Sequence, residues 1–204
     1  MVTDEVVYDL QDDRWLKNLA QLKKDQKKVV LTFDDGPGRH LNSILDILQQ
    51  KNAPAMFFWQ SRLLHPKRPW KRVLDEGHII GSHAHNHKNL TNLSREQQYR
   101  QIKGSLEKIE AVTDQKVRYF RPPFGQYNED TMDIMEELEL TPVMWEISSY
   151  DWEHKEKPEK IFCNVIENIQ PGSIILLHEL EQTVSILPEL IDEIKEKGYE
   201  ISLP

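Results

Sequence analysis

Short apolar runs, rich in β-branched residues, alternate along most of this chain with stretches in which apolar residues recur every three or four positions. The runs are apolar on both faces, which is typical of strands buried inside a parallel sheet. We therefore predict seven strands, over residues 29–33, 55–59, 78–82, 118–122, 141–147, 173–178 and 199–203.

Helical periodicity fills the segments between these runs. It predicts helices over residues 41–50, 95–112, 129–139, 158–169 and 186–197. Ser94 with Gln97 matches a capping box, and Asn128 is a good N-cap residue. Gly198 suits the position just after the last helix, whereas Pro188 is compatible with that helix only in its first turn.

Strand–helix alternation over about 175 residues predicts a parallel sheet covered by helices. Two architectures fit this pattern: a doubly wound open sheet, and a (β/α) barrel with a missing or irregular strand. Residues 1–27 are polar and charge-rich, and we interpret them as an N-terminal extension with a helix over residues 15–23. Residues 28–204 show no linker or internal repeat and are predicted to form one domain.

Composition excludes several classes of function. The one cysteine, Cys163, rules out an internal disulfide framework and any zinc site built from several cysteines, and we expect it to be a core thiol. The net charge of -8 argues against a nucleic-acid partner. The longest apolar runs, such as residues 174–177, are far shorter than the roughly 20 residues that span a bilayer. Residues 1–14 are acidic and lack the apolar core of a leader, so we expect a protein that acts inside the cell, or a trimmed chain.

Polar residues that interrupt the apolar pattern lie just after the strands, where α/β proteins build their sites. The first group is Asp34-Asp35 in the run TFDDGP. Adjacent carboxylates repel each other unless a cation lies between them. One carboxylate on a metal and the other acting as a base would resolve this conflict, and a solvated turn is the alternative.

The second group holds three histidines within five residues, His83, His85 and His87. Imidazole is the commonest side-chain ligand of zinc-like cations. His83 and His87, four positions apart, can converge on one ion if the chain turns helically, whereas His83 and His85 require a different turn. Without the aspartates, the alternative is a histidine-rich surface loop.

Three further groups follow later strands. Arg121, stiffened by two following prolines, is either placed to bind a carboxylate bidentately or an ordinary arginine at a loop entry. Trp152 either walls a pocket or belongs to the core. His178 ends an apolar strand and, taken alone, is typical of a core histidine. With Asp151 as its hydrogen-bond partner, it would instead be held protonated as an acid.

Together these groups closely resemble the polysaccharide deacetylase family, carbohydrate esterase family 4, with its NodB homology domain. Five motifs occur in the family's order: TFDDGP at 32–37, SHAHNH at 82–87, RPPFG at 121–125, Trp145 with Asp151-Trp152, and LLH at 176–178. The resemblance extends from about Lys28 to Leu203. It implies a distorted, TIM-like (β/α) barrel of about seven parallel strands with helices outside, with residues 28–204 as the catalytic domain.

The resemblance also implies a divalent cation, with zinc as the first candidate and cobalt, nickel or manganese as alternatives. Asp35, His83 and His87 would hold it. Asp34 would be the general base that activates the attacking water, and Arg121 would orient Asp34. One aspartate and two histidines leave positions open on the metal, as a catalytic site requires.

The remaining motifs imply the acid and the substrate contacts. His178 would be the general acid for the leaving amine, tuned by Asp151. The backbone N–H of Phe124 would stabilise the oxyanion, and Leu176 would line the slot for the acetyl methyl group. Four residues are implied as substrate contacts: Pro123, Phe124, Trp152 and Leu176.

The implied activity is removal of N-acetyl groups from an N-acetylhexosamine polymer or oligomer of the peptidoglycan, chitin or poly-N-acetylglucosamine type, by a monomer. Such a substrate favours the cell surface or secretion. The alternatives are O-deacetylation of a xylan-like polysaccharide, hydrolysis of a small cyclic amide, and a carbohydrate-binding module on an inactive scaffold. Ser148 replaces an aspartate of the family pattern and Lys88 replaces a proline, but neither change removes a catalytic group.

Overall fold

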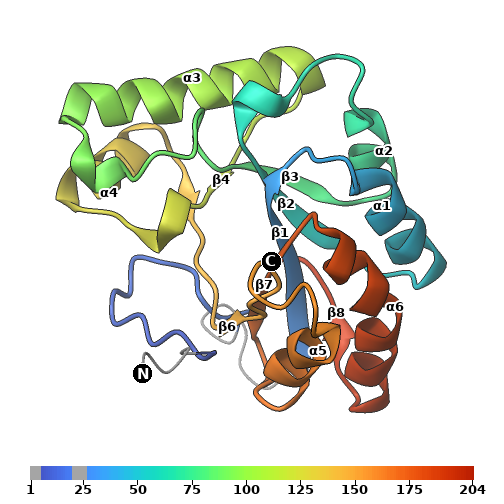
Figure 1. Ribbon diagram of the computed structural model, residues 1–204. Helices are drawn as coiled ribbons and strands as arrows, with labels where there is room; N and C mark the ends of the chain where they lie inside the picture. The colour runs from blue at the N-terminus through green and yellow to red at the C-terminus, as the bar shows by residue number, and fades with distance from the viewer. Residues whose placement is uncertain (1–5, 20–26) are drawn as a thin grey trace.

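The computed structural model describes residues 6–19 and 27–204. Seven parallel strands form a curled half-barrel with helices around it (Figure 1). The strands lie in the order β5-β4-β3-β2-β1-β7-β6, and β8 pairs with the beginning of β1. This arrangement confirms the distorted barrel and excludes the doubly wound open sheet.

The strand positions follow the predicted apolar runs, with one exception. The observed strands are β1 Lys28–Gly36, β2 Ala55–Trp59, β3 Ile79–Ser82, β4 Tyr119–Phe120, β5 Thr141–Pro142, β6 Ile147–Ser148, β7 Ile174–His178 and β8 Glu200–Ile201. The single strand predicted over residues 141–147 is wrong, because this run divides into β5 and β6 at the two opposite ends of the sheet. The residues between them therefore cross the open side of the half-barrel.

The N-terminal segment, residues 6–19, contacts both edges of that open side. The N–H of Tyr8 donates to the carbonyl of Glu146, at 2.8 Å, beside β6. Leu16 accepts a backbone hydrogen bond from Met144 at 2.9 Å, beyond β5. The predicted helix over residues 15–23 is wrong for its first part, since Leu16 lies in a bridge to the sheet, while residues 20–23 lie outside the described part of the chain.

Six helices are described, and most begin and end close to their predicted positions. They are α1 Leu41–Gln50, α2 Trp70–Asp75, α3 Arg95–Thr113, α4 Glu129–Glu137, α5 Pro158–Ile166 and α6 Glu181–Glu196, with short 3₁₀ turns at Ser61–Leu63, Leu90–Asn92 and Pro123–Gly125. Both halves of the capping box of Ser94 and Gln97 form, and Asn128 caps α4. Gly198 follows α6 with φ +82°, as predicted.

Two details of the helices contradict the prediction. Helix α6 begins at Glu181, so Pro188 lies inside it and not in its first turn. Cys163 is exposed, because α5 buries Ile161 and Val165. At about 100° per residue, position 163 lies on the opposite side of α5 from both.

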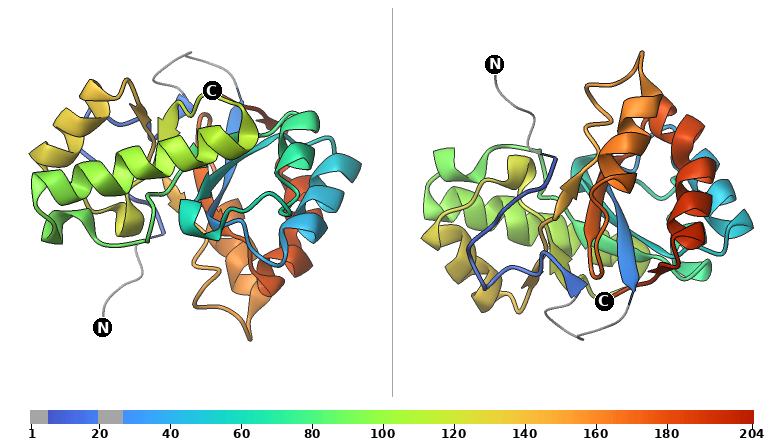
Figure 2. Two further views of the ribbon diagram at one scale, coloured as in Figure 1. Left: turned by 90° about the horizontal axis from the view of Figure 1, so that it is seen from above. Right: turned by 90° about the horizontal axis from the view of Figure 1, so that it is seen from below.

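The helices lie around the outside of the half-barrel. Figure 2, which views the molecule along the barrel from above and below, shows the helices around the side of the sheet. The inner core is closely packed, with the rings of Phe33 from β1 and Phe57 from β2 stacked 5.2 Å apart. Because all the paired strands run parallel, their carboxyl ends lie at one end of the half-barrel.

Candidate active site

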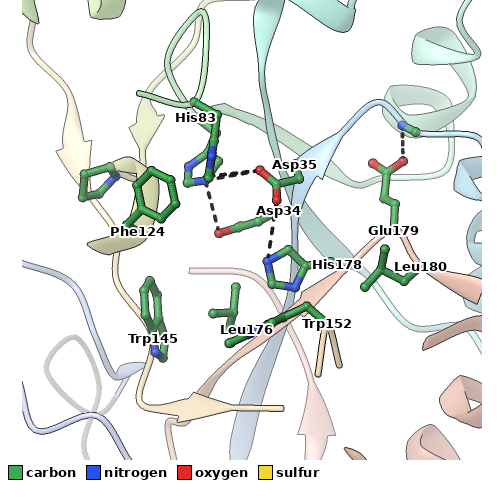
Figure 3. A pocket seen from close by; sticks show the side chains of 13 residues that line it. Asp34, Asp35, His83, Phe124, Trp145, Trp152, Leu176, His178, Glu179 and Leu180 are labelled. Carbon is green, nitrogen blue, oxygen red and sulfur yellow. Dashed lines mark hydrogen bonds and ion pairs between the residues drawn. The ribbon is translucent and has the colours of Figure 1, made fainter. Parts of the chain in front are cut away.

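A cavity of about 500 Å³ opens at the carboxyl ends of the strands (Figure 3). Most of the side chains predicted to be functional line it: Asp34, Asp35, His83, His87, Phe124, Trp152, Leu176 and His178. They come from motifs that are far apart in the sequence. The curled parallel sheet brings them together, because each motif lies at or just after the carboxyl end of a strand.

A β-bulge explains how two consecutive aspartates reach the same cavity. Asp34 pairs with Phe58 and Gly36 pairs with Trp59, so Asp35 is an extra residue in the ladder between β1 and β2. Its φ is +68°. Neighbouring side chains of a regular strand point to opposite faces, whereas a bulge redirects one of them. The bulge therefore turns Asp35 to the side that Asp34 already faces.

Asp34 is paired with a fully buried arginine. Its Oδ1 lies 2.8 Å from Nη1 of Arg121, and the two side chains are 4% and 0% exposed. Three further guanidinium hydrogens are donated to Thr32 Oγ1 and to the carbonyls of Val143 and Met144. A buried charge is tolerated when its hydrogen-bonding groups are satisfied in this way. The arginine therefore fixes the Asp34 carboxylate in one orientation.

Asp35, His83 and His87 form the one group among the described residues that has the composition and spacing of a metal site. Their ligand atoms all lie within 4.8 Å of one another. Asp35 Oδ1 is 3.3 Å from His87 Nε2 and 3.8 Å from His83 Nε2. The other ring nitrogen of His83 is 2.8 Å from the carbonyl of Arg121, which orients Nε2 toward the group. This donor set fits a divalent cation such as zinc.

The turn that brings the two histidines together is not helical. Ala84 and His87 have positive φ values, +62° and +35°. His85 lies outside the cluster, because its Nδ1 is 2.8 Å from Oγ of Ser61. The structure thus places His83 and His87 next to Asp35, and directs His85 elsewhere.

The charges of this cluster are coupled. Burial alone would raise the pKa of Asp35, but three neighbouring histidines and a 2.7 Å hydrogen bond from Gln60 outweigh burial and lower it. Burial, together with the neighbouring imidazole of His83, lowers the pKa of His87. Metal binding requires a deprotonated carboxylate and neutral imidazole ligands, and the shifts of Asp35 and His87 are both in the direction of those forms.

His178 lies on the opposite side of Asp35 and is held by Asp151. Its Nδ1 is 2.7 Å from Asp151 Oδ1, and its backbone N–H donates to Oδ2 at 2.6 Å. The hydroxyl of Thr183 also donates to Oδ2, at 2.6 Å. Burial opposes protonation of His178, but the charge and hydrogen bond of Asp151 prevail and raise its pKa to about 9. The Nε2 atom points toward the cavity, 3.9 Å from Asp35 Oδ2.

Aromatic side chains form the two walls of the cavity. Phe124 is 59% exposed and lies 4.4 Å from the ring of His87, while Trp152 is 44% exposed and meets His178 edge-on at 5.1 Å. In Figure 3, Phe124 lies to the left of the aspartates and Trp152 lies below them, next to His178. Leu176 also lines the cavity, between Trp145 and Trp152 in Figure 3. Pro123 is buried, and its neighbour Pro122 lines the cavity in its place.

The prediction from the sequence did not include several residues that support this site. Gln60 directly follows β2, so the rule that polar residues just after strands belong to the site could have identified it. Thr183 lies in α6 and had no such signal. Glu179 follows His178 in the sequence and lines the cavity, where burial raises its pKa to about 7 against the hydrogen bonds that lower it.

A family model described as polysaccharide deacetylase matches residues 21–143. The chain belongs to the polysaccharide deacetylase family. It is 33% identical to the peptidoglycan-N-acetylglucosamine deacetylase of Bacillus cereus, over 88% of this chain and 68% of that protein. It is 32% identical to the chitooligosaccharide deacetylase of Azorhizobium caulinodans, over 80% of this chain and 79% of that protein. The chain spans only 38% of the peptidoglycan-N-acetylglucosamine deacetylase PgdA of Listeria monocytogenes.

Solved structures of the polysaccharide deacetylase family have the same fold. A family 4 carbohydrate esterase from Streptomyces lividans, in complex with acetate, matches with a TM-score of 0.81 at 26% identity, covering 86% of this chain and 92% of that one. BA3943 of Bacillus anthracis, a pseudoenzyme of this family, matches with a TM-score of 0.79 at 30% identity, over 86% and 63% of the two chains. Among the described helices, none is both long and apolar enough to cross a membrane.

Proposed function

We propose that this protein is a divalent-metal-dependent deacetylase that removes N-acetyl groups from an N-acetylhexosamine polymer or oligomer. Peptidoglycan, chitin and poly-N-acetylglucosamine are the candidate substrates, and zinc is the first candidate for the metal. One observation carries the proposal: a metal-type cluster, a buried base and a histidine with a raised pKa line one cavity. Relatives named as deacetylases of peptidoglycan and chitooligosaccharides support it.

The proposed reaction has two proton transfers, one to a base and one from an acid. A cation held by Asp35, His83 and His87 would polarise the acetyl carbonyl and make a water more acidic. Asp34 accepts a proton from the attacking water while the oxygen of that water bonds to the acetyl carbon. Arg121 keeps the Asp34 carboxylate in place for this transfer.

The carbon–nitrogen bond then breaks, and the leaving nitrogen needs a proton. His178 Nε2 donates it, and acetate and a free amine result. Asp151 holds the ring orientation and favours the protonated form before the transfer. The backbone N–H of Phe124 is the proposed donor to the oxygen that becomes negative in the transition state.

The walls of the cavity indicate the kind of substrate. Phe124 and Trp152 expose large apolar surfaces beside the polar cluster, as ligand grooves commonly do. The apolar faces of sugar rings fit between such aromatic side chains. Leu176 offers a small apolar contact for the acetyl methyl group.

The two departures from the family pattern place no side chain among the residues that line this cavity. Ser148 is buried in β6 and is not one of the described lining residues, and Lys88 is exposed. Neither contributes a side chain to the proposed base, acid or metal cluster. This placement favours an active enzyme over an inactive carbohydrate-binding module, the alternative that the pseudoenzyme neighbour BA3943 raises.

Acetate release from a panel of substrates tests the proposal. We expect release from acetylated chito-oligosaccharides or peptidoglycan, loss of activity after chelation, and recovery with Zn²⁺. Faster release from acetylated xylan would identify an O-acetyl esterase. Binding of the oligosaccharides without any acetate release would identify an inactive module. The Asp34→Asn variant controls for a contaminating deacetylase.

A further inference from the structure

Glu179 is a buried carboxylate at the cavity that the proposed mechanism does not use. It directly follows β7 and is 7% exposed. Its Oε2 accepts a hydrogen bond from the backbone N–H of Gly38 at 2.5 Å, and its Oε1 accepts one from Nε1 of Trp59 at 3.1 Å. Figure 3 shows Glu179 at the cavity with its bond to a backbone nitrogen, and the two bonds together connect the loop after β1 to the end of β2.

Two glycines fit closely around this carboxylate. A Cβ atom at Gly36 would lie 1.9 Å from Oε1 of Glu179, and one at Gly38 would lie 3.0 Å from Oε2. Neither glycine has a positive φ. Glycine is therefore needed at Gly36 because the carboxylate approaches the backbone, and not because of the dihedral angles.

These contacts surround the bulge at Asp35. Gly36, the next residue, rejoins the ladder opposite Trp59, and its carbonyl accepts a 2.9 Å hydrogen bond from the N–H of Gln60. Glu179 binds Trp59 on the β2 side of this junction and Gly38 on the β1 side. The backbone on which Asp35 sits is therefore held from both strands.

We propose that Glu179 is a positioning residue that fixes the bulge at Asp35, and so sets the distance from the Asp35 carboxylate to His83 and His87. The inference rests on the proposed function, because it concerns the same cation site. A carboxylate suits this role, since both of its oxygens accept hydrogen bonds and both neighbours are donors. A glutamine has only one acceptor oxygen. Its amide N–H group would therefore face one of the two donors, Gly38 N–H or Trp59 Nε1–H, without forming a hydrogen bond.

The Glu179→Gln variant tests this assignment. Glu181→Gln is the matched control, since Glu181 is an exposed glutamate in the first turn of α6. We expect the Zn²⁺ affinity of Glu179→Gln to fall about tenfold, at the lower end of the roughly 10–100-fold losses seen for outer-shell partners of metal ligands. The control should bind Zn²⁺ as the wild type does. Titration calorimetry on the metal-free proteins measures both.

A second readout reports the contact itself. The indole N–H resonance of Trp59 in the metal-free protein should shift in Glu179→Gln, because its acceptor has changed. It should stay in place in Glu181→Gln. An unshifted resonance together with unchanged Zn²⁺ affinity in a folded Glu179→Gln protein would overturn the proposal.

The Trp59→Phe variant separates the hydrogen bonds from general packing. It removes one donor, so the glutamine amide no longer faces an N–H group. Glu179→Gln should therefore cost less Zn²⁺ affinity in the Trp59→Phe background than in the wild type. Equal losses in the two backgrounds would overturn the assignment. If Glu179→Gln does not fold, the Trp59→Phe variant alone is the test, and an unchanged Zn²⁺ affinity in that variant would overturn the assignment.

None of these measurements uses an acetylated substrate. A failure of the proposed function would appear differently, as a wild-type protein that binds Zn²⁺ yet releases no acetate from any substrate of the panel. The role of Glu179 in placing Asp35 would still be decided by the affinities of its variants.

Discussion

Asp34 and Asp35 are adjacent in the sequence and have different surroundings. Asp34 is almost fully buried and bound to the guanidinium of Arg121, whereas Asp35 is 41% exposed and lies among imidazole rings. A carboxylate already bound by an arginine is poorly placed to coordinate a cation as well. At the scale of single residues, this difference is the basis for assigning Asp34 as base and Asp35 as ligand.

Exchange of each carboxylate for an amide should separate these two roles. Asp34→Asn is expected to keep its Zn²⁺ affinity and to lose about 10²–10⁴-fold in turnover, the usual contribution of a positioned base. Asp35→Asn should lose most of its Zn²⁺ affinity. Calorimetry and acetate release measure the two effects.

Circular dichroism is the control for these two variants, because Asp34→Asn leaves the buried charge of Arg121 unpaired. Loss of Zn²⁺ affinity in a folded Asp34→Asn protein, with retention in Asp35→Asn, would mean that the two roles are exchanged.

The pKa of His178 should depend on the charge of Asp151. The carboxylate stabilises the imidazolium, so His178 stays protonated until the pH rises through its pKa of about 9. Asp151→Asn removes that charge, so the pKa should fall and the basic limb of kcat/KM should move to lower pH. NMR titration of the His178 ring in the metal-free protein checks the shift directly.

Thr183→Val provides a comparison for this titration, because it removes a hydrogen bond to Asp151 and keeps the charge. Its effect on the pKa of His178 should be much smaller. Equal shifts in Thr183→Val and Asp151→Asn would contradict the electrostatic explanation.

At the scale of elements, the N-terminal segment completes the side of the half-barrel that β5 and β6 leave open. Its bridges to Ile147 and Val143 lie on either side of Trp145, which lines the cavity. The ring of Tyr8 lies 5.2 Å from that of Trp145. Trp145 in turn packs on Gly125, where a Cβ would meet its ring at 2.8 Å. The segment thus supports Trp145, a lining residue of the cavity, from outside.

Loss of the Tyr8 ring should weaken substrate binding more than it slows the chemistry. An aromatic pair contributes about 0.5–1.5 kcal/mol beyond its buried area, which corresponds to about a twofold to tenfold rise in KM for Tyr8→Ala. The value of kcat should change less, because Tyr8 touches no proposed acid, base or ligand. Val7→Ala, at a residue that is 40% exposed, is the neighbouring control. A fall in kcat with unchanged KM would show that the segment acts on the reacting groups.

At the scale of the whole molecule, the N-terminal segment also belongs to the hydrophobic core. Trp15 is 1% exposed and joins the same buried cluster as the strands and helices of the barrel. Its ring lies 4.5 Å from that of Tyr127, which precedes α4. The stability of the barrel therefore depends on residues that precede β1.

A pair of tryptophan substitutions measures this dependence. Trp15→Ala should lower the free energy of unfolding by about 3–5 kcal/mol, the usual cost of emptying a buried aromatic site. Trp152→Ala, at the exposed wall of the cavity, should cost about 1 kcal/mol or less, as surface substitutions do. Urea denaturation gives both values. Similar losses in the two variants would mean that Trp15 contributes no more to the core than Trp152 does.

The sequence alone determined the class of fold, most of the elements and the groups of the candidate site. Apolar periodicity predicted β1, β2 and β7 and the helices α1 and α3, because each of these signals extends over a few neighbouring residues. The site groups were also predictable, since each polar motif directly follows an apolar run, and parallel strands bring such positions together. Ser94 and Asn128 cap their helices as expected, because a cap is a local contact.

Only the tertiary structure decided the features that depend on contacts distant in sequence. The run over 141–147 divides because its first residues pair with β4 and its last residue pairs with β7, at opposite ends of the sheet. The N-terminal segment, more than 100 positions away, bridges to Val143 and Ile147 across the gap. Pro188 is accepted within α6, a position that local helix rules disfavour. The bulge at Asp35 and the hydrogen bonds of Glu179 need β1, β2 and β7 in place together. Periodicity records only which side of one element is apolar, so the partner that each polar residue meets is decided by the packing of the strands.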